Sequence, residues 1–149
     1  MPDSSSNTPP RPQSAGIPGA ATMRRFVLLH HLCGADSHYD LMIEVGELLA
    51  TWRLPRPLER IDAAPVAAVR IGMHRRAYLD YEGPLAGGRG SVRAVDRGTC
   101  AVTIEQPGDL DLCEGETWRV DFRGERTQGM VRLRCAGPAP DDWVIERGA

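Results

Sequence analysis

Three of the four histidines lie within nine residues, and the last of them opens the segment His38-Tyr39-Asp40. Because side chains alternate between the two faces of a strand, His38 and Asp40 would emerge side by side from an extended segment. An imidazole and a carboxylate at this spacing can reach one divalent cation. With His31 from the preceding segment they would form a three-ligand site with open coordination positions, which suits manganese, iron or zinc.

Strand alternation also sets the surroundings of these three residues. His30 must point to the opposite face from His31, and Met42 shares the face of His38 and Asp40. The other face of this segment is uniformly apolar or aromatic and should pack on a core. Two alternatives stay open: a solvated polar face without metal, and a zinc site in which Cys33 joins His31 and His38.

The fourth histidine, His74, begins a second polar and aromatic segment that ends in the glycine-rich run Gly87-Gly88-Arg89-Gly90. Residues 66–99 contain six arginines and three acids, a local charge of +3 in a chain whose net charge is −2. Acidic residues gather instead at Asp109, Asp111, Glu114 and Glu116. This separation favours an anionic ligand such as phosphate, whereas the alternative is a loop whose arginines only meet solvent.

The elements that must position these residues are short runs of β-type residues separated by glycine and proline. Hairpin turns are predicted at Gly46-Glu47 and at residues 95–99, where Gly98 could adopt positive φ, and one helical turn is predicted within 58–64. This pattern indicates an all-β fold: a small closed or nearly closed antiparallel β-barrel, or a two-sheet sandwich. The predicted strands are Arg25–His31, His38–Val45, Leu48–Arg53, Val66–Ile71, Ser91–Val95, Cys100–Gln106, Thr117–Phe122, Gly129–Cys135 and Trp143–Glu146.

Composition divides the 149 residues into two parts. Residues 1–22 are rich in proline, serine and glycine and predict a disordered N-terminal tail, and residues 23–149 form one domain. Met23 stands at the boundary and is a candidate start residue. The four cysteines show no Cys-x-x-Cys spacing, which favours reduced thiols. No signal peptide or apolar run of about 18 residues is evident, so a soluble cytoplasmic protein without membrane contact is expected.

The same residues, in this order, resemble the 3′-phosphoesterase domain of bacterial DNA ligase D. The resemblance runs from about Arg24 to Glu146, and no single motif in it is decisive. It rests on Arg25-Phe26-Val27, His31, His38-Tyr39-Asp40, Trp52 with Pro55, His74 with Tyr78, Tyr81-Glu82-Gly83, Gly90-Ser91-Val92, Asp96-Arg97-Gly98-Thr99 and Trp143-Val144-Ile145.

The resemblance implies a small β-barrel that binds Mn²⁺ or another divalent metal such as Zn²⁺ or Co²⁺. It places the metal ligands at His31, His38 and Asp40, and an active-site histidine and tyrosine at His74 and Tyr78. Relatives trim a terminal ribonucleoside or remove a 3′-phosphate from DNA ends. The expected partners are therefore DNA or DNA/RNA 3′ ends and a DNA ligase or repair polymerase. The protein is expected to be a monomer that associates with the nucleoid when it is bound to DNA.

The chain departs from the family pattern at several positions, including the seven-residue step from His31 to His38, Leu29 and Gly72. The departure with the clearest consequence is Met42, which stands where the resemblance implies an active-site arginine. A thioether cannot hold phosphate as a guanidinium does, so another arginine should supply the cation. Arg25 on the His31 face and Arg89 in the glycine loop are the candidates, followed by Arg76. If no other arginine binds the phosphate, the enzyme should be slow and Met42→Arg should raise its rate. If another arginine already binds the phosphate, Met42→Arg should give no increase in rate.

Three functions are compatible with these residues. The first is a metal-dependent phosphoesterase that processes 3′ ends in DNA repair, in the setting of non-homologous end joining. The second, motivated by Met42, is a catalytically weak or inactive module that binds DNA ends or a repair partner. The third is an iron oxygenase barrel whose ligands are His38, Asp40 and His74.

Overall fold

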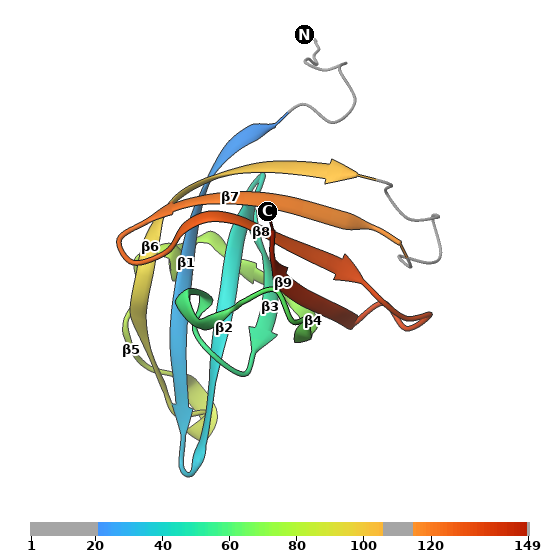
Figure 1. Ribbon diagram of the computed structural model, residues 1–149. Coiled ribbons are helices and arrows are strands. Elements are labelled where there is room, and N and C mark those ends of the chain that lie inside the picture. The colour runs from blue at the N-terminus through green and yellow to red at the C-terminus, as the bar shows by residue number, and fades with distance from the viewer. Residues whose placement is uncertain (1–20, 106–114, 149) are drawn as a thin grey trace, which may run out of the picture.

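Alternating apolar residues along eight strands build a closed antiparallel β-barrel, as the sequence pattern predicts (Figure 1). The computed structural model describes residues 21–105 and 115–148. The strands follow the order β1-β2-β3-β4-β9-β8-β7-β6, and pairing of β6 with β1 closes the barrel. Their bounds are β1 Thr22–Cys33, β2 Asp36–Val45, β3 Leu48–Leu54, β4 Val66–Arg75, β6 Ser91–Glu105, β7 Thr117–Gly124, β8 Gln128–Cys135 and β9 Asp142–Arg147.

Short elements complete the described chain. Strand β5 (Gly83–Pro84), which the sequence did not predict, pairs with the start of β6. The helical turn expected within 58–64 is the 3₁₀ turn η1 (Leu58–Arg60), and two further turns, η2 (Arg76–Leu79) and η3 (Ala86–Gly88), lie between β4 and β6. Among the described residues, no helix is both long and apolar enough to span a membrane.

The barrel interior is a hydrophobic core with three tryptophans at its centre. Trp52 meets Trp118 and Trp143 edge to face, with ring centroids 5.0 and 5.5 Å apart. The guanidinium of Arg70 lies 4.6 Å from the Trp52 ring centroid, close enough for a cation–π contact. Leu41 and Ile43 of β2 are buried in this core, and Tyr39 and Val45 pack against it, so the predicted alternation of 38–45 is confirmed.

The prediction of a turn at residues 95–99 is wrong, because β6 continues through these residues as one strand of 15 residues. Gly98 does not adopt positive φ there; instead, a Cβ at this position would lie 2.3 Å from the backbone oxygen of Arg123, so glycine permits close approach of β7. Val95 is skipped in the pairing with β1, a bulge that bends the strand. Asp96 accepts backbone N–H bonds from Arg126 and Thr127 and so stabilises the β7–β8 turn.

Other sequence predictions have mixed outcomes. The Gly46-Glu47 turn is confirmed, with φ of +60° at Gly46, and it joins β2 to β3. Thr22 begins β1, one residue before the expected domain start, and the rest of the expected tail up to residue 20 lies outside the described residues. Gln106, Cys113 and the acids Asp109, Asp111 and Glu114 also lie outside them. The three described cysteines, Cys33, Cys100 and Cys135, are free thiols.

A second, smaller hydrophobic cluster lies on the outer face of the barrel. We call it the outer cluster; its buried members are Val27, Leu29, Met42, Leu49, Leu79 and Val92. Residues of β1, β2, β3 and β6 point outward into it, and Leu79 of η2 covers them. Tyr78 and Leu85 pack against its edge. This cluster holds segment 76–90 against the barrel, beside the histidines of the β1–β2 hairpin.

Candidate metal and phosphate site

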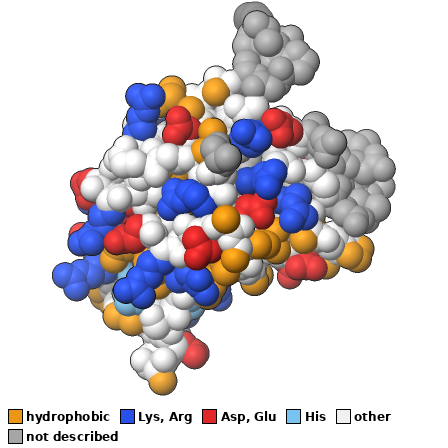
Figure 2. Space-filling model, viewed as in Figure 1, with side chains coloured by type: hydrophobic (Ala, Val, Ile, Leu, Met, Phe, Trp, Pro, Cys, Tyr) orange, Lys and Arg blue, Asp and Glu red, His pale blue; other side chains and the backbone are white. Residues whose placement is uncertain are grey.

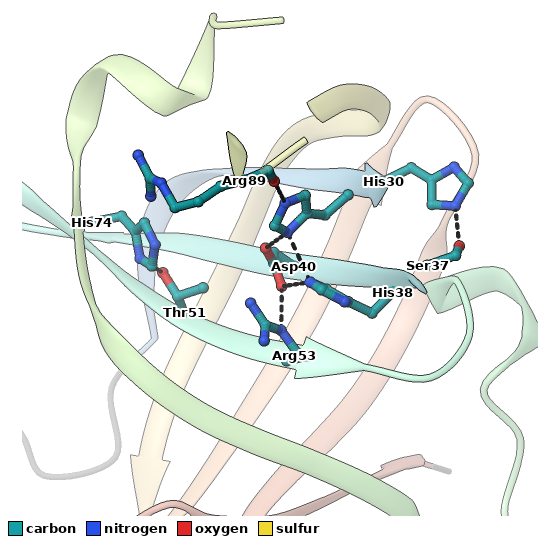
Figure 3. Close-up of polar contacts among 9 residues, drawn as sticks. His30, Ser37, His38, Asp40, Thr51, Arg53, His74 and Arg89 are labelled. Carbon is teal, nitrogen blue, oxygen red and sulfur yellow. Dashed lines mark hydrogen bonds and ion pairs between the residues drawn. The ribbon is translucent and has the colours of Figure 1, made fainter. Parts of the chain in front are cut away.

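His31, His38 and Asp40 converge near the end of the β1–β2 hairpin (Figure 3). His31 and His38 are directly opposite each other in the strand register, and Asp40 follows on the same face of β2. The distance from His31 Nδ1 to His38 Nε2 is 2.9 Å, and the Asp40 carboxylate oxygens lie 3.8 Å and 3.7 Å from these nitrogens. Within the described chain, these are the residues whose grouping could hold a metal ion.

The backbone of the glycine-rich loop fixes the orientation of His31. Its Nε2 lies 2.6 Å from the Arg89 carbonyl oxygen, which can only accept, so Nε2 carries the proton. In the neutral ring, Nδ1 then presents a lone pair toward His38. Gly90 allows this arrangement, because its φ is +84° and a Cβ there would lie 1.9 Å from the Leu32 oxygen. The backbone of the loop therefore packs closely on β1 at this point.

Electrostatics favour a neutral His38. Burial lowers the pKa of His38 below its ordinary value of 6.5, and this effect outweighs the attraction of Asp40 and Asp36. The guanidinium of Arg53 and the neighbouring His31 ring act in the same direction as burial. Neutral imidazole is the form that ligates metals. Asp40 is only 4% exposed, and it is surrounded by His31, His38 and Arg53.

The three donors fit a divalent cation. One donor atom from each of the three residues can be chosen so that the three atoms lie within 4.8 Å of one another. Ligand atoms about 2.1 Å from a shared ion stand roughly 3–3.5 Å apart, so the side chains must move inward to hold one. Two imidazoles and one carboxylate suit manganese, iron, cobalt or zinc. The hydrogen bond from His31 to the Arg89 carbonyl is the outer support that such ligands usually have.

His74 and Tyr78 lie in the same pocket, beside the three-ligand cluster. His74 Nδ1 lies 3.0 Å from the hydroxyl of Thr51, and that hydroxyl donates its one proton to the Leu49 carbonyl. The hydroxyl must therefore accept from His74, so Nδ1 carries a proton and Nε2 is left for a ligand. The Tyr78 ring meets the His74 ring edge to face at 5.7 Å.

Of the three candidate arginines, only Arg89 lies at the pocket. Arg89 lines the pocket, and its guanidinium extends toward the His74 side in Figure 3. Arg25 is six residues before His31 in β1, about 20 Å along the strand, and pairs with Asp80 at 3.2 Å. Arg76 forms an ion pair with Glu44. The structure thus brings Arg89 to the site, and it places Arg25 and Arg76 elsewhere.

Arg53 is the site residue that sequence reasoning missed. It lines the pocket from β3, and its Nε lies 3.3 Å from Asp40 Oδ1. The signal was present in the Gly46-Glu47 turn, because a two-residue turn that pairs Val45 with Leu48 also pairs Asp40 with Arg53. A second guanidinium therefore stands beside the three-ligand cluster and lines the same pocket as Met42, which is buried in the outer cluster.

These side chains enclose a pocket of about 360 Å³. Figure 2 shows arginine side chains flanking the small exposed histidine surface on this side of the molecule. Cys33 also lines the pocket, and its thiol is 3.7 Å from the Gly88 carbonyl oxygen, outside the three-ligand cluster. His30 faces away, as expected, where it bonds to Ser37 and stacks on Tyr39.

Comparison with known proteins agrees with this geometry. No curated protein sequence matches the chain. The family model of the DNA ligase D 3′-phosphoesterase domain matches residues 30–134, which include the three-ligand cluster, both pocket arginines, His74 and Tyr78. With this match over more than half of its length and a closed β-barrel fold, the chain belongs to the DNA ligase D 3′-phosphoesterase domain family.

Proposed function

We propose that this protein is a metal-dependent phosphoesterase that processes the 3′ ends of nucleic acids in DNA repair. Family membership supports 3′-end processing, and one observation carries the finer proposal. The three-ligand cluster shares a pocket with His74, Tyr78 and two arginines, which is the combination that phosphate-ester hydrolysis requires.

His31, His38 and Asp40 would hold Mn²⁺ or a similar cation. When bound, such an ion neutralises phosphate oxygens and lowers the pKa of a coordinated water. The Arg89 carbonyl keeps His31 in the tautomer that ligates through Nδ1.

The remaining pocket residues act on the phosphate. Thr51 keeps the proton on His74 Nδ1, so Nε2, when protonated, can donate to the oxygen that leaves phosphorus. The Tyr78 hydroxyl donates to a nonbridging phosphate oxygen. Arg53 and Arg89 supply positive charge around the phosphate, which stabilises the additional negative charge of the transition state.

The substrates proposed are DNA ends that carry a 3′-phosphate or a terminal ribonucleoside. Removal of either leaves a 3′-hydroxyl, which is the group that a ligase or polymerase consumes. We therefore place the protein as a cytoplasmic monomer that acts before ligation in end joining.

The test is incubation of the purified protein with Mn²⁺ and primer–templates that end in a 3′-phosphate or a single ribonucleotide, followed by gel analysis of the ends. Trimmed or dephosphorylated product is expected. His38→Ala and Asp40→Ala should each abolish stoichiometric Mn²⁺ binding by calorimetry and also abolish product. His30→Ala, on the opposite face of β1, is the matched control and should retain both. Product formation by the two ligand variants would refute the proposal.

A catalytically silent module that binds 3′ ends is the second candidate, and Met42 favours it. Its signature is Mn²⁺ and DNA-end binding by the wild-type protein without any processed product.

A further inference from the structure

A second pocket adjoins the metal and phosphate site. Its volume is about 480 Å³, and its walls include Ala77, Tyr81, Pro84 and Ala86, which the mechanism above does not use. It shares Tyr78, Leu85 and Arg89 with the first pocket, so these three side chains form a wall between neighbouring pockets. Both volumes lie in the range of small-molecule binding sites.

An aromatic row leads from one pocket to the other. His74 meets Tyr78 edge to face at 5.7 Å, and Tyr78 meets Tyr81 edge to face at 5.9 Å. His74 lies in the phosphate pocket, Tyr78 lies in the shared wall, and Tyr81 lies in the second pocket. Tyr81 is 38% exposed, one of the large apolar side chains in the described chain that remain open to solvent.

The position of Tyr81 is fixed by its neighbours. Its hydroxyl donates to the Pro84 carbonyl, and a Cβ on Gly83 would lie 3.2 Å from the Tyr81 hydroxyl oxygen. Glu82 accepts the backbone N–H of Ala94 at 2.8 Å, which ties this segment to β6. An exposed ring that is held in one orientation loses little entropy when a flat ligand packs on it.

The charge of the second pocket suits a nucleotide. Arg75 and Arg89 outnumber Asp80 along its walls. A terminal phosphate bound in the first pocket is covalently attached to a sugar and a base, which must lie on an adjoining surface. The second pocket adjoins it, and it offers aromatic and apolar surface where a base needs to stack.

We propose that the second pocket is a nucleobase subsite, in which Tyr81 stacks with the base of the nucleotide at the 3′ end. This inference rests on the proposed function, because it assigns the phosphate to the first pocket. Every base offers a flat face, so binding here is tolerant of sequence.

The test compares two primer–templates that both end in a 3′-phosphate and differ only in the terminal nucleotide, which has a base in one and is abasic in the other. Wild-type protein should show a KM about five- to a hundredfold lower for the end with a base, the range expected for one stacking contact. Tyr81→Ala should reduce this ratio to about one, whereas Tyr81→Phe, which keeps the ring and loses only the hydrogen bond to Pro84, should keep a ratio clearly above one. Val69→Ala, a similarly exposed apolar site on β4, should leave the wild-type ratio unchanged.

A second readout separates this inference from the proposed function. Fluorescence anisotropy of the two labelled ends, with EDTA present, measures binding without turnover. Preference of the wild-type protein for the end with a base, lost in Tyr81→Ala, supports the subsite even if no end is processed. Equal KM values together with equal affinities overturn the subsite, while processing of both ends leaves the phosphoesterase standing.

Discussion

We expect Arg53 to supply the positive charge that the family resemblance led us to expect at position 42, and Arg53→Ala tests this. The guanidinium lies 3.3 Å from Asp40 and its side chain is 42% exposed. A hydrogen bond to a charged group contributes about 1.5–3 kcal/mol, and solvent access places Arg53 near the lower end. Because each 1.36 kcal/mol corresponds to a tenfold change, Arg53→Ala should slow turnover on a 3′-phosphate primer about tenfold.

The Mn²⁺ affinity of Arg53→Ala distinguishes two possible roles of Arg53. If it contacts phosphate, Arg53→Ala lowers kcat/KM and leaves the Mn²⁺ dissociation constant from calorimetry unchanged, and Arg53→Lys recovers part of the rate. If it only positions Asp40, Mn²⁺ binding weakens in step with the rate. Arg119→Ala is the matched control, because Arg119 is 41% exposed and lies 3.8 Å from Glu105. An undiminished rate in folded Arg53→Ala would refute both roles.

Met42→Arg gives the complementary test. Met42 is 2% exposed in the outer cluster, and Arg53 and Arg89 already bring two positive charges to the pocket. A third guanidinium must be accommodated in a buried, cationic position, which is unfavourable. We therefore expect lower thermal stability and no gain in rate. A clear increase in kcat would show that neither Arg53 nor Arg89 fills the missing role.

Three further predictions concern single side chains. Thr51→Val removes the acceptor for His74 Nδ1, so kcat should fall about two- to tenfold, while Thr51→Ser should retain the wild-type rate. Asp96→Ala leaves two backbone N–H groups of the β7–β8 turn without their buried acceptor and should cost about 3 kcal/mol in urea unfolding. Burial raises the pKa of Cys100 to about 12. Its thiol therefore ionises only in the unfolded chain from about pH 9 upward, and the free energy of unfolding should fall by up to about 1.4 kcal/mol per pH unit until about pH 12. Cys100→Ala should show a shallower decline; equal slopes would contradict the assignment.

Strand alternation predicted much of the site, because it depends only on local geometry. It placed His38 and Asp40 on one face of their strand and His30 on the opposite face from His31. The approach of His31 to His38 depends instead on the register between β1 and β2, which alternation alone does not give. Alternation gives the face of a residue but not its distance from the site along the strand. Arg25 shares the face of His31 but lies at the far end of β1, where it pairs with Asp80.

The errors came from residues whose local preference differs from their tertiary role. Asp96, Arg97 and Gly98 are typical turn residues, yet they lie in one strand, where Asp96 stabilises a turn elsewhere and Gly98 permits close strand packing. Segment 76–90 has no periodic pattern to predict it, because it folds as short 3₁₀ turns held by the outer cluster. The second pocket depends on that segment and was therefore not foreseen.

Segment 76–90 has far less buried apolar contact than the barrel to which it is attached. Among the described residues, the barrel core contains 20 buried side chains, whereas the outer cluster contains six, of which only Leu79 comes from the segment. Local opening free energies follow the extent of buried apolar contact, so this segment should detach far more often than the barrel unfolds. Amide hydrogen exchange should therefore be faster in residues 76–90 than in β7 and β8. Mn²⁺ should slow exchange in this segment. His31, one of the proposed ligands, also bonds to the Arg89 carbonyl, so an ion that holds His31 in place also stabilises the attached form of the segment.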